Sequence, residues 1–263
     1  MSHVISKDGT KIAYEQDGSG PPLLFIDGAF CYRGFGPGAS IARELRDHFT
    51  VIRYDRRGRG GSSNGTTWSA DREVEDIAAL LAAAGGSAHV LGVSSGAALA
   101  LAAAGSGLPI DRLAVFEPPF VVDDTHAPMP ADFVDRVRAA AAGNRRGDAV
   151  KMFMRLVGAP GIAILVMRLF PAWKKLCAVA HTLPWDLSLV APHHRGRPFP
   201  AGCWDNVRTP TLVLYGGKSP AFMQNSARAL AAALPAADCE LLPKQTHMVK
   251  PRVLADALIP FFK

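Results

Sequence analysis

A serine that could act as a nucleophile stands between two glycines in the run Gly92-Val93-Ser94-Ser95-Gly96. A short apolar segment precedes this run, and a stretch rich in alanine and leucine follows it. Such flanks predict a strand that turns sharply into a helix, which exposes the Ser94 hydroxyl and aims the Ser95 N–H at the same point. The helix start adds partial positive charge there. The pattern indicates attack on a carbonyl by Ser94, whereas a plain connecting loop is the less specific alternative.

A serine nucleophile needs a base to accept its proton. In sheets of this kind the histidine comes last in the chain, in the loop after the final strand. His247 lies in that loop, just before a closing segment of helical spacing. A lone histidine in a polar loop is usually a surface residue, but its position relative to the strands favours His247 as the base.

The acid that would orient the histidine is not where the pattern usually puts it. The predicted strand 211–215 is followed by Gly216-Gly217-Lys218-Ser219, which contains no carboxylate. Glu117 ends the preceding predicted strand, and the carboxyl ends of neighbouring parallel strands share one edge of a sheet. A glutamate that ends a buried strand needs a partner. We therefore predict Glu117 as the acid, with Asp123 and Asp124 as weaker candidates.

The loop after the apolar run 23–26 carries Asp27, Gly28 and Ala29. A negative oxygen that forms during attack on a carbonyl needs a second N–H donor besides that of Ser95. Glycine lets the backbone approach closely, so we expect the N–H of Gly28 or of Ala29 to complete this oxyanion hole. Asp27 is expected to hold the loop in shape.

The elements that must position these residues follow one pattern along most of the chain. Short apolar runs alternate with segments of helical spacing, which predicts a mostly parallel central sheet with helices on both faces. The first two predicted strands, 4–5 and 11–14, flank Asp8-Gly9 and should form a hairpin. The remaining predicted strands are 23–26, 51–54, 88–92, 112–116, 211–215 and 239–242. The helices predicted between and after them are 41–49, 70–84, 95–104, 221–234 and 252–262.

The alternation stops after Glu117-Pro118-Pro119. The chain up to residue 206 then contains no convincing strand, and its helical stretches are 132–142, 149–156, 162–170 and 173–182. We therefore expect an α/β core of residues 1–120 and 207–263, with a helical cap, residues 121–206, inserted into it. Some of the Met, Phe, Trp and Leu side chains of the cap are expected to line an apolar pocket above Ser94.

The composition is that of an ordinary globular chain. Of 263 residues, 49% are hydrophobic and 20% are charged, which suffices for one large core with an insertion. No apolar run is long enough to span a bilayer, and residues 1–20 lack the apolar centre of a signal peptide. We therefore expect a cytoplasmic protein without a membrane partner.

The charges and the metal-ligating residue types argue against other classes of function. The net charge of +6 comes from arginines in short clusters such as 56–59 and 145–146, without the interleaved aromatics typical of nucleic-acid binding. A solvated basic surface and no nucleic-acid partner are expected. The four cysteines are scattered, and the adjacent His193 and His194 point in different directions. Free thiols are therefore expected, and no metal site.

Together these motifs resemble the α/β-hydrolase superfamily over essentially the whole chain. The segments that carry the resemblance are Asp8-Gly9-Thr10, Asp27-Gly28, Tyr54-Asp55-Arg56-Arg57-Gly58-Arg59-Gly60, the run 92–96 and His247. The resemblance implies the α/β-hydrolase fold, with a mostly parallel sheet, helices on both faces and an inserted helical cap.

Three features resemble one subgroup, the zearalenone-type lactone hydrolases. They are an Asp-Gly in place of His-Gly at the oxyanion loop, Ser-Ser-Gly-Ala at the nucleophile, and a Glu-x-Pro-like ending of the strand that supplies the acid. The resemblance implies a Ser-His-Glu triad, here Ser94, His247 and Glu117. It also supports Ser95 and Gly28 as oxyanion donors.

The resemblance departs in the cap, where a substrate-contacting tryptophan of the subgroup would fall near Val179. We expect a serine hydrolase that cleaves a carboxylic ester or lactone of a bulky apolar substrate through an acyl-enzyme, without a cofactor. A serine at position 94 argues against haloalkane or epoxide hydrolysis, which use a carboxylate nucleophile. The alternatives are a C–C bond hydrolase or lyase-like biosynthetic enzyme, and a catalytically silent ligand-binding homologue, which only the missing acid near Ser219 favours. The expected partner is the small apolar substrate, with a homodimer left open.

Overall fold

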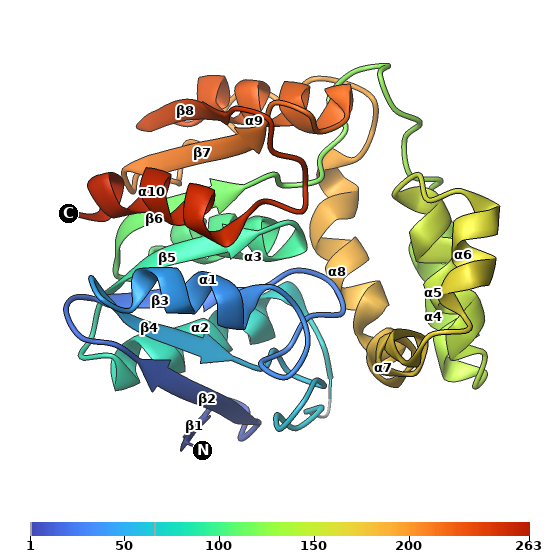
Figure 1. Ribbon diagram of the computed structural model, residues 1–263, viewed down its shortest axis with the longest axis horizontal. Coiled ribbons are helices and arrows are strands. Elements are labelled where there is room, and N and C mark those ends of the chain that lie inside the picture. Colours follow the sequence, from blue (N-terminus) through green and yellow to red (C-terminus); the bar gives the residue numbers. More distant parts are fainter. Residues whose placement is uncertain (1, 66) are drawn as a thin grey trace.

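The computed structural model describes residues 2–65 and 67–263, which contain one large sheet with helices on both sides (Figure 1). The strands of the described residues lie in the order β1-β2-β4-β3-β5-β6-β7-β8. They are β1 (Ser2–Ile5), β2 (Lys11–Asp17), β3 (Pro22–Ile26), β4 (Thr50–Tyr54), β5 (Ala88–Val93), β6 (Ile110–Phe116), β7 (Thr211–Gly216) and β8 (Ala237–Leu242). β2 is antiparallel to both β1 and β4, and β4, β3, β5, β6, β7 and β8 run parallel. The predicted fold class is therefore confirmed, and β1 and β2 form the predicted hairpin.

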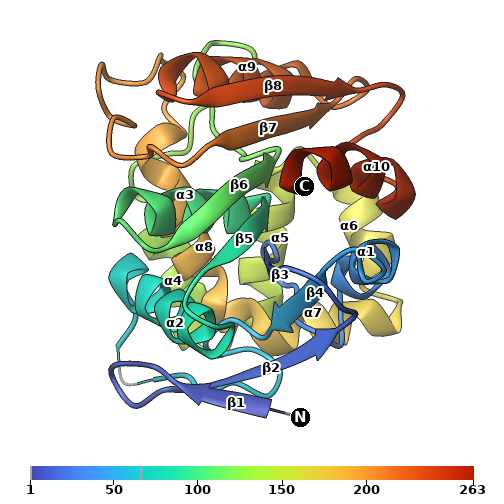
Figure 2. The same ribbon diagram turned by 90° about the vertical axis from the view of Figure 1, so that its left-hand side faces the viewer.

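Helices cover both faces of the sheet, as Figure 2 shows. They are α1 (Gly38–Leu45), α2 (Ala70–Ala83), α3 (Ser95–Gly105), α9 (Ala221–Ala233) and α10 (Pro251–Phe262). Leu24 and Ile26 of β3 belong to the core formed with α2, α3 and α9, whereas Leu23 and Phe25 belong to the core formed with α1 and α10. Successive strand residues point to opposite faces, so a strand that is covered on both sides must be apolar throughout. This is why a central strand such as β3 reads as an uninterrupted apolar run, whereas the edge strand β8 is largely exposed and contains Asp238 and Glu240.

Five α-helices lie between β6 and β7 in the described chain. They are α4 (Phe133–Ala142), α5 (Arg146–Leu156), α6 (Gly161–Met167), α7 (Pro171–Val179) and α8 (Leu183–Val190). The carboxyl ends of β4 and β7 point toward α8, and α4 to α7 lie beyond it (Figure 1). No helix of the described residues is long and apolar enough to cross a membrane.

The helix α8 differs from the sequence-based prediction, which has no helix between residues 183 and 206. It begins with a proline in its first turn, Pro184, followed by an acidic residue, Asp186, and both are typical helix-start signals. Its residues are mostly apolar and buried, so it lacks a solvent-exposed polar face. The alternation of apolar and polar residues with a period of 3.6 is therefore weak in its sequence. The missed helix carries a residue that contacts the candidate site.

Candidate active site

Ser94 occupies the tight turn between β5 and α3. Its backbone has φ 57° and ψ −126°, a conformation that costs a non-glycine residue of order 1–3 kcal/mol. A Cβ on Gly96 would lie 2.3 Å from the Ile26 carbonyl oxygen, and one on Gly92 would lie 2.7 Å from the Ala97 Cα. Only glycines therefore fit two positions before and two positions after the serine, which explains their spacing in the sequence.

The structure brings Glu117 and His247 together, from the end of β6 and the loop after β8. His247 Nδ1 lies 2.7 Å from Glu117 Oε2, and Glu117 is fully buried. The second carboxylate oxygen, Oε1, accepts a hydrogen bond of 2.8 Å from the Gly216 N–H. The ring of Phe116 stacks on the His247 ring at 6.2 Å between centroids. Both carboxylate oxygens are thus engaged, and the pairing of Nδ1 leaves His247 Nε2 for proton transfer.

The same strand end connects this pair to the serine. The Ser94 N–H donates to the carbonyl oxygen of Phe116 at 3.0 Å, and Phe116 directly precedes Glu117. Because β5 and β6 are neighbours in the sheet, Ser94 and Glu117 leave adjacent strands at the same edge. Ser94 and the Glu117–His247 pair therefore lie at the same edge of the sheet.

The end of β7, where an acid is usual, contributes a hydrogen-bond donor in its place. Gly216 supplies the N–H that binds Glu117, and a Cβ on Gly216 would lie 2.6 Å from the Gln245 carbonyl oxygen. The weaker candidates lie elsewhere: Asp123 accepts hydrogen bonds from Thr125 and Asn225, and Asp124 is exposed.

The predicted oxyanion loop packs directly against the serine. A Cβ on Gly28 would lie 3.0 Å from the Ser94 Cβ and 3.6 Å from its Oγ, so only glycine lets the loop come this close. The Gly28 N–H, however, donates to Asp27 Oδ1 at 2.8 Å and is already engaged. The candidate donors that remain are the N–H of Ala29 and that of Ser95, which as the first residue of α3 has no intrahelical partner.

Asp27 is a buried carboxyl next to this hole, and burial raises its pKa from 3.8 to about 6. Because the folded pKa exceeds the unfolded one, the folded state holds this proton more tightly. The corresponding stability is therefore present below about pH 4 and is lost as the pH rises through about 6.

Asp27→Asn keeps an oxygen for the Gly28 N–H but carries no charge. We expect it to raise the free energy of unfolding by roughly 1–3 kcal/mol above pH 6, with little gain near pH 4. Urea unfolding of both proteins at the two pH values checks this. An equal gain at both would contradict the titration of Asp27.

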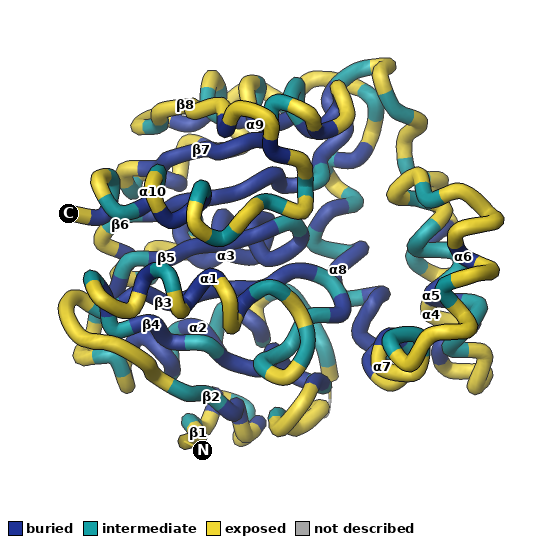
Figure 3. Tube along the Cα trace, in the orientation of Figure 1, coloured by how far each residue is buried: buried dark blue, intermediate teal, exposed yellow. Residues whose placement is uncertain are grey.

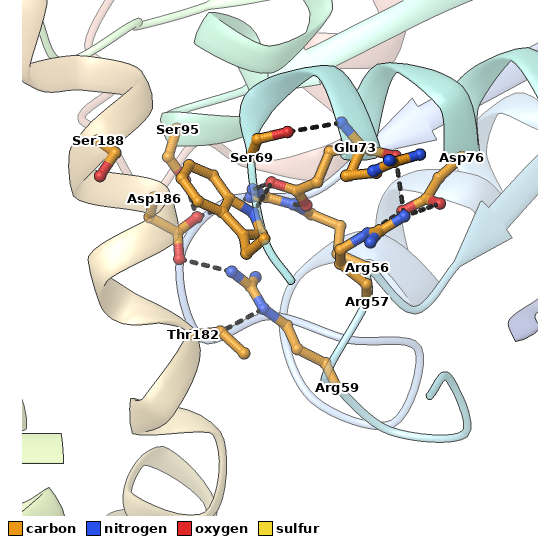
Figure 4. Close-up of polar contacts among 12 residues, drawn as sticks. Arg56, Arg57, Arg59, Ser69, Glu73, Asp76, Ser95, Thr182, Asp186 and Ser188 are labelled. Carbon is orange, nitrogen blue, oxygen red and sulfur yellow. Dashed lines mark hydrogen bonds and ion pairs between the residues drawn. The ribbon is translucent and has the colours of Figure 1, made fainter. Parts of the chain in front are cut away.

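Three arginines of the loop after β4, Arg56, Arg57 and Arg59, are buried among carboxylates (Figure 4). Arg56 binds the two oxygens of Glu73 at 2.8 and 2.7 Å, and Arg57 binds those of Asp76 at the same distances. This corrects the expectation of a solvated basic surface at this cluster. A guanidinium can leave water here because carboxylates neutralise it and accept its N–H groups.

The cluster contacts one side of the candidate oxyanion hole through Asp186, the residue on the missed helix α8, and the other side through Arg59. The Ser95 hydroxyl donates to Asp186 Oδ1 at 2.8 Å, and Arg56 and Arg59 both bind the same carboxylate. Arg59 also donates to the Gly28 carbonyl oxygen at 2.8 Å. Burial would raise the pKa of Asp186, but the charges of Arg59 and Arg56 outweigh it and hold the pKa below its ordinary value.

Asp186→Ala would leave Arg56 and Arg59 with one carboxylate fewer in a buried site. Removing one partner of a buried ion pair costs about 3–5 kcal/mol, so we expect the free energy of unfolding to fall by that amount in urea titrations. Asp135→Ala is the matched control, because its pair with Arg138 is exposed, and we expect little change there. Equal effects of the two substitutions would argue against a stabilising cluster.

The helices between β6 and β7 pack an apolar cluster onto the oxyanion loop. The Phe30 ring, next to Ala29, meets the Phe153 ring of α5 edge to face at 5.0 Å between centroids. Val179 and Leu183 are buried in the same cluster. Apolar side chains thus lie beside the loop that faces Ser94.

A cavity of about 670 Å³ lies between the loop after β4 and these helices, and its lining is more polar. Ser94 and His247 are not part of its lining. The polar and aromatic side chains that line it include Asn64, Arg138, Arg146, His181 and Trp185. Among the described residues, the cavity lining included, no three His, Cys, Asp or Glu side chains lie close enough together to hold a metal ion.

Comparison with known proteins gives consistent matches. Residues 23–257 match the Alpha/beta hydrolase family. A crystal structure of an alpha/beta hydrolase from Sphaerobacter thermophilus is 47% identical in sequence, covers 100% of both chains and has a TM-score of 0.91. A thermophilic esterase from Thermogutta terrifontis is 21% identical over 99% of this chain and 97% of that one, with a TM-score of 0.73, and shows the fold alone.

A curated relative provides a shorter match. The N-formylmaleamate deformylase of Pseudomonas putida is 37% identical over 120 residues. The match covers 43% of this chain and 44% of that enzyme, which is less than half of either.

Proposed function

The chain belongs to the alpha/beta hydrolase family, and we propose that it is a serine hydrolase that cleaves a carboxylic ester or lactone of a bulky apolar substrate. The observation that carries the proposal is the buried Glu117 carboxylate bonded to His247 Nδ1, at the sheet edge where Ser94 stands in its turn. A carboxylate in this position keeps the ring proton on Nδ1 and stabilises the imidazolium that forms when Nε2 accepts a proton.

The proposed reaction has two halves. Ser94 Oγ attacks the carbonyl carbon while His247 Nε2 takes its proton, and the N–H groups of Ser95 and Ala29 bind the negative oxygen. When the carbonyl re-forms, the C–O bond to the alcohol breaks, and His247 gives its proton to the departing oxygen. A water then attacks the acyl-enzyme with the same base, and the acid and free Ser94 result.

The apolar cluster on the oxyanion loop supports the substrate class. We propose that residues 121–206 act as a cap over Ser94 and supply apolar walls, with Phe30 and Phe153 beside the hole. The resemblance to zearalenone-type lactone hydrolases extends the proposal to lactones. The small buried Val179, in place of that subgroup's tryptophan, favours a different substrate.

Bulky apolar acyl or alcohol groups should therefore be preferred over acetate esters. Burying apolar surface is favourable by about 25 cal/mol per Å², so a larger apolar group should raise kcat/KM about tenfold or more. Aryl esters of increasing acyl length, assayed under one set of conditions, measure this. Faster turnover of small charged esters would overturn the apolar pocket.

A second candidate is hydrolysis of an N-acyl amide that bears a carboxylate. The deformylase relative and the cavity that Arg138, Arg146 and His181 line both favour it, because these side chains suit an anionic group. The same triad would act, with nitrogen as the leaving atom.

One panel separates the two candidates. Aryl esters, macrolactones and N-formyl amide acids are incubated with wild type and with Ser94→Ala, and products are identified by mass. Hydrolysis of the esters or lactones that disappears in Ser94→Ala supports the first candidate. Formate release from the amide acids alone supports the second, and turnover that survives the substitution contradicts both.

A further inference from the structure

One stretch of the helices between β6 and β7 leaves large apolar side chains in water. Among the described residues nine large hydrophobic side chains are exposed, and six of them lie between residues 157 and 170. These six, the apolar patch, are Val157, Ile162, Leu165, Val166, Leu169 and Phe170. Figure 3 shows α6 exposed along the outer edge of the molecule. A group of exposed apolar side chains marks an interaction surface more often than single scattered ones do.

The helix α6 presents its apolar face outward. Leu165 and Val166 follow Ile162 by three and four positions, so the three side chains share a face of the helix. Ile164, on the opposite face, is buried. Leu169, at 84% exposure, and Phe170 follow in the turn after the helix. The outward face of α6 is thus as apolar as its inward face. Packing within the described chain does not explain the apolar outward face, because its side chains are exposed.

The segment of chain that carries the patch holds charge of one sign. Residues 149–185 contain no Asp or Glu and five Lys or Arg residues. Four of these, Arg155, Arg168, Lys174 and Lys175, are exposed, and none forms an ion pair with a carboxylate of the described residues. An apolar face bordered by unpaired cations is the pattern of segments that lie in the headgroup region of anionic lipids.

We propose that the apolar patch docks this protein onto an anionic lipid surface. The apolar side chains of α6 enter the headgroup boundary, and the flanking arginines and lysines bind lipid phosphates. A second copy of the chain fits the patch less well, because a two-fold contact would set the same unpaired cations against each other. The sequence predicts no membrane partner because no segment can span a bilayer, but a contact with the bilayer surface needs no spanning segment.

Sedimentation with lipid vesicles tests the proposal on the full chain. We expect binding to equimolar phosphatidylcholine and phosphatidylglycerol vesicles that weakens with salt, and little binding to phosphatidylcholine alone. Leu169→Ser with Phe170→Ser should lower the lipid partition coefficient at least about tenfold. Arg168→Gln with Lys174→Gln should lower it roughly 30-fold, at about 1 kcal/mol per cation.

Two substitutions outside the patch serve as controls. Ile5→Ser and Lys263→Gln alter an exposed apolar residue and an exposed cation far from the patch in sequence, and should leave vesicle binding unchanged. Unfolding temperatures of all variants confirm that each is folded. Absence of vesicle binding, or binding that the patch variants retain, would overturn the proposal. So would a dimer that Leu169→Ser with Phe170→Ser dissociates, because a second copy would then be the occupant.

Discussion

Ser94→Ala is expected to lower kcat on any ester substrate by about 10⁵-fold or more, because the members of a catalytic triad act as a unit. The substitution removes the atom that attacks the carbonyl but should leave the backbone unchanged, since alanine is serine without its hydroxyl. Folding and substrate binding should therefore persist. Initial rates with an aryl ester, together with KM, measure the effect.

Ser95→Ala is the matched control, because it removes a hydroxyl at the next position of the same turn. It keeps the backbone N–H that we assign to the oxyanion hole and loses one hydrogen bond to Asp186. We expect a far smaller loss of kcat than for Ser94→Ala. A rate near that of the wild type in Ser94→Ala would end the proposed mechanism.

Glu117→Gln is expected to lower kcat by roughly 10³- to 10⁴-fold, as when a triad carboxylate is replaced by its amide. The glutamine oxygen can stay on the Gly216 N–H, which then turns the amide NH₂ toward His247 Nδ1. Two donors cannot share one hydrogen bond, so the ring proton moves to Nε2, and that nitrogen can no longer accept the serine proton. The loss should appear in kcat more than in KM.

Ser219→Ala is the control for the position after β7 where an acid is usual. Ser219 is buried, and its hydroxyl has no partner among the described residues, so its loss should change the rate little. A large loss in Ser219→Ala beside a small one in Glu117→Gln would show that Glu117 is not the acid.

The sheet could be predicted from the sequence because both of its faces are buried. The central parallel strands then read as short apolar runs, as at Leu23 to Ile26, and most helices between the runs have one apolar face. The helix α8 could not be predicted in the same way, because it has no polar face to contrast with an apolar one. It lies between other elements, so its sequence lacks the polar face that marks a surface helix.

The candidate site was predictable where backbone geometry fixes the residue type. Gly92 and Gly96 allow the turn at Ser94, and Glu117 was the available carboxylate at the right strand end. The structure places Glu117 against His247, while their role in catalysis stays a prediction. Contacts between distant segments could not be predicted. The burial of Arg59 depends on Asp186, which follows it by 127 positions in the chain.

The central claim is that Ser94 is a nucleophile activated by His247 and Glu117, and covalent labelling tests it most directly. A fluorophosphonate is added to wild type, Ser94→Ala and Glu117→Gln, and intact mass with peptide mapping locates the adduct. We predict one adduct per wild-type chain, on Ser94, none on Ser94→Ala, and labelling of Glu117→Gln slowed about as much as its kcat. An adduct on another residue, or an unlabelled wild-type protein, would contradict the claim.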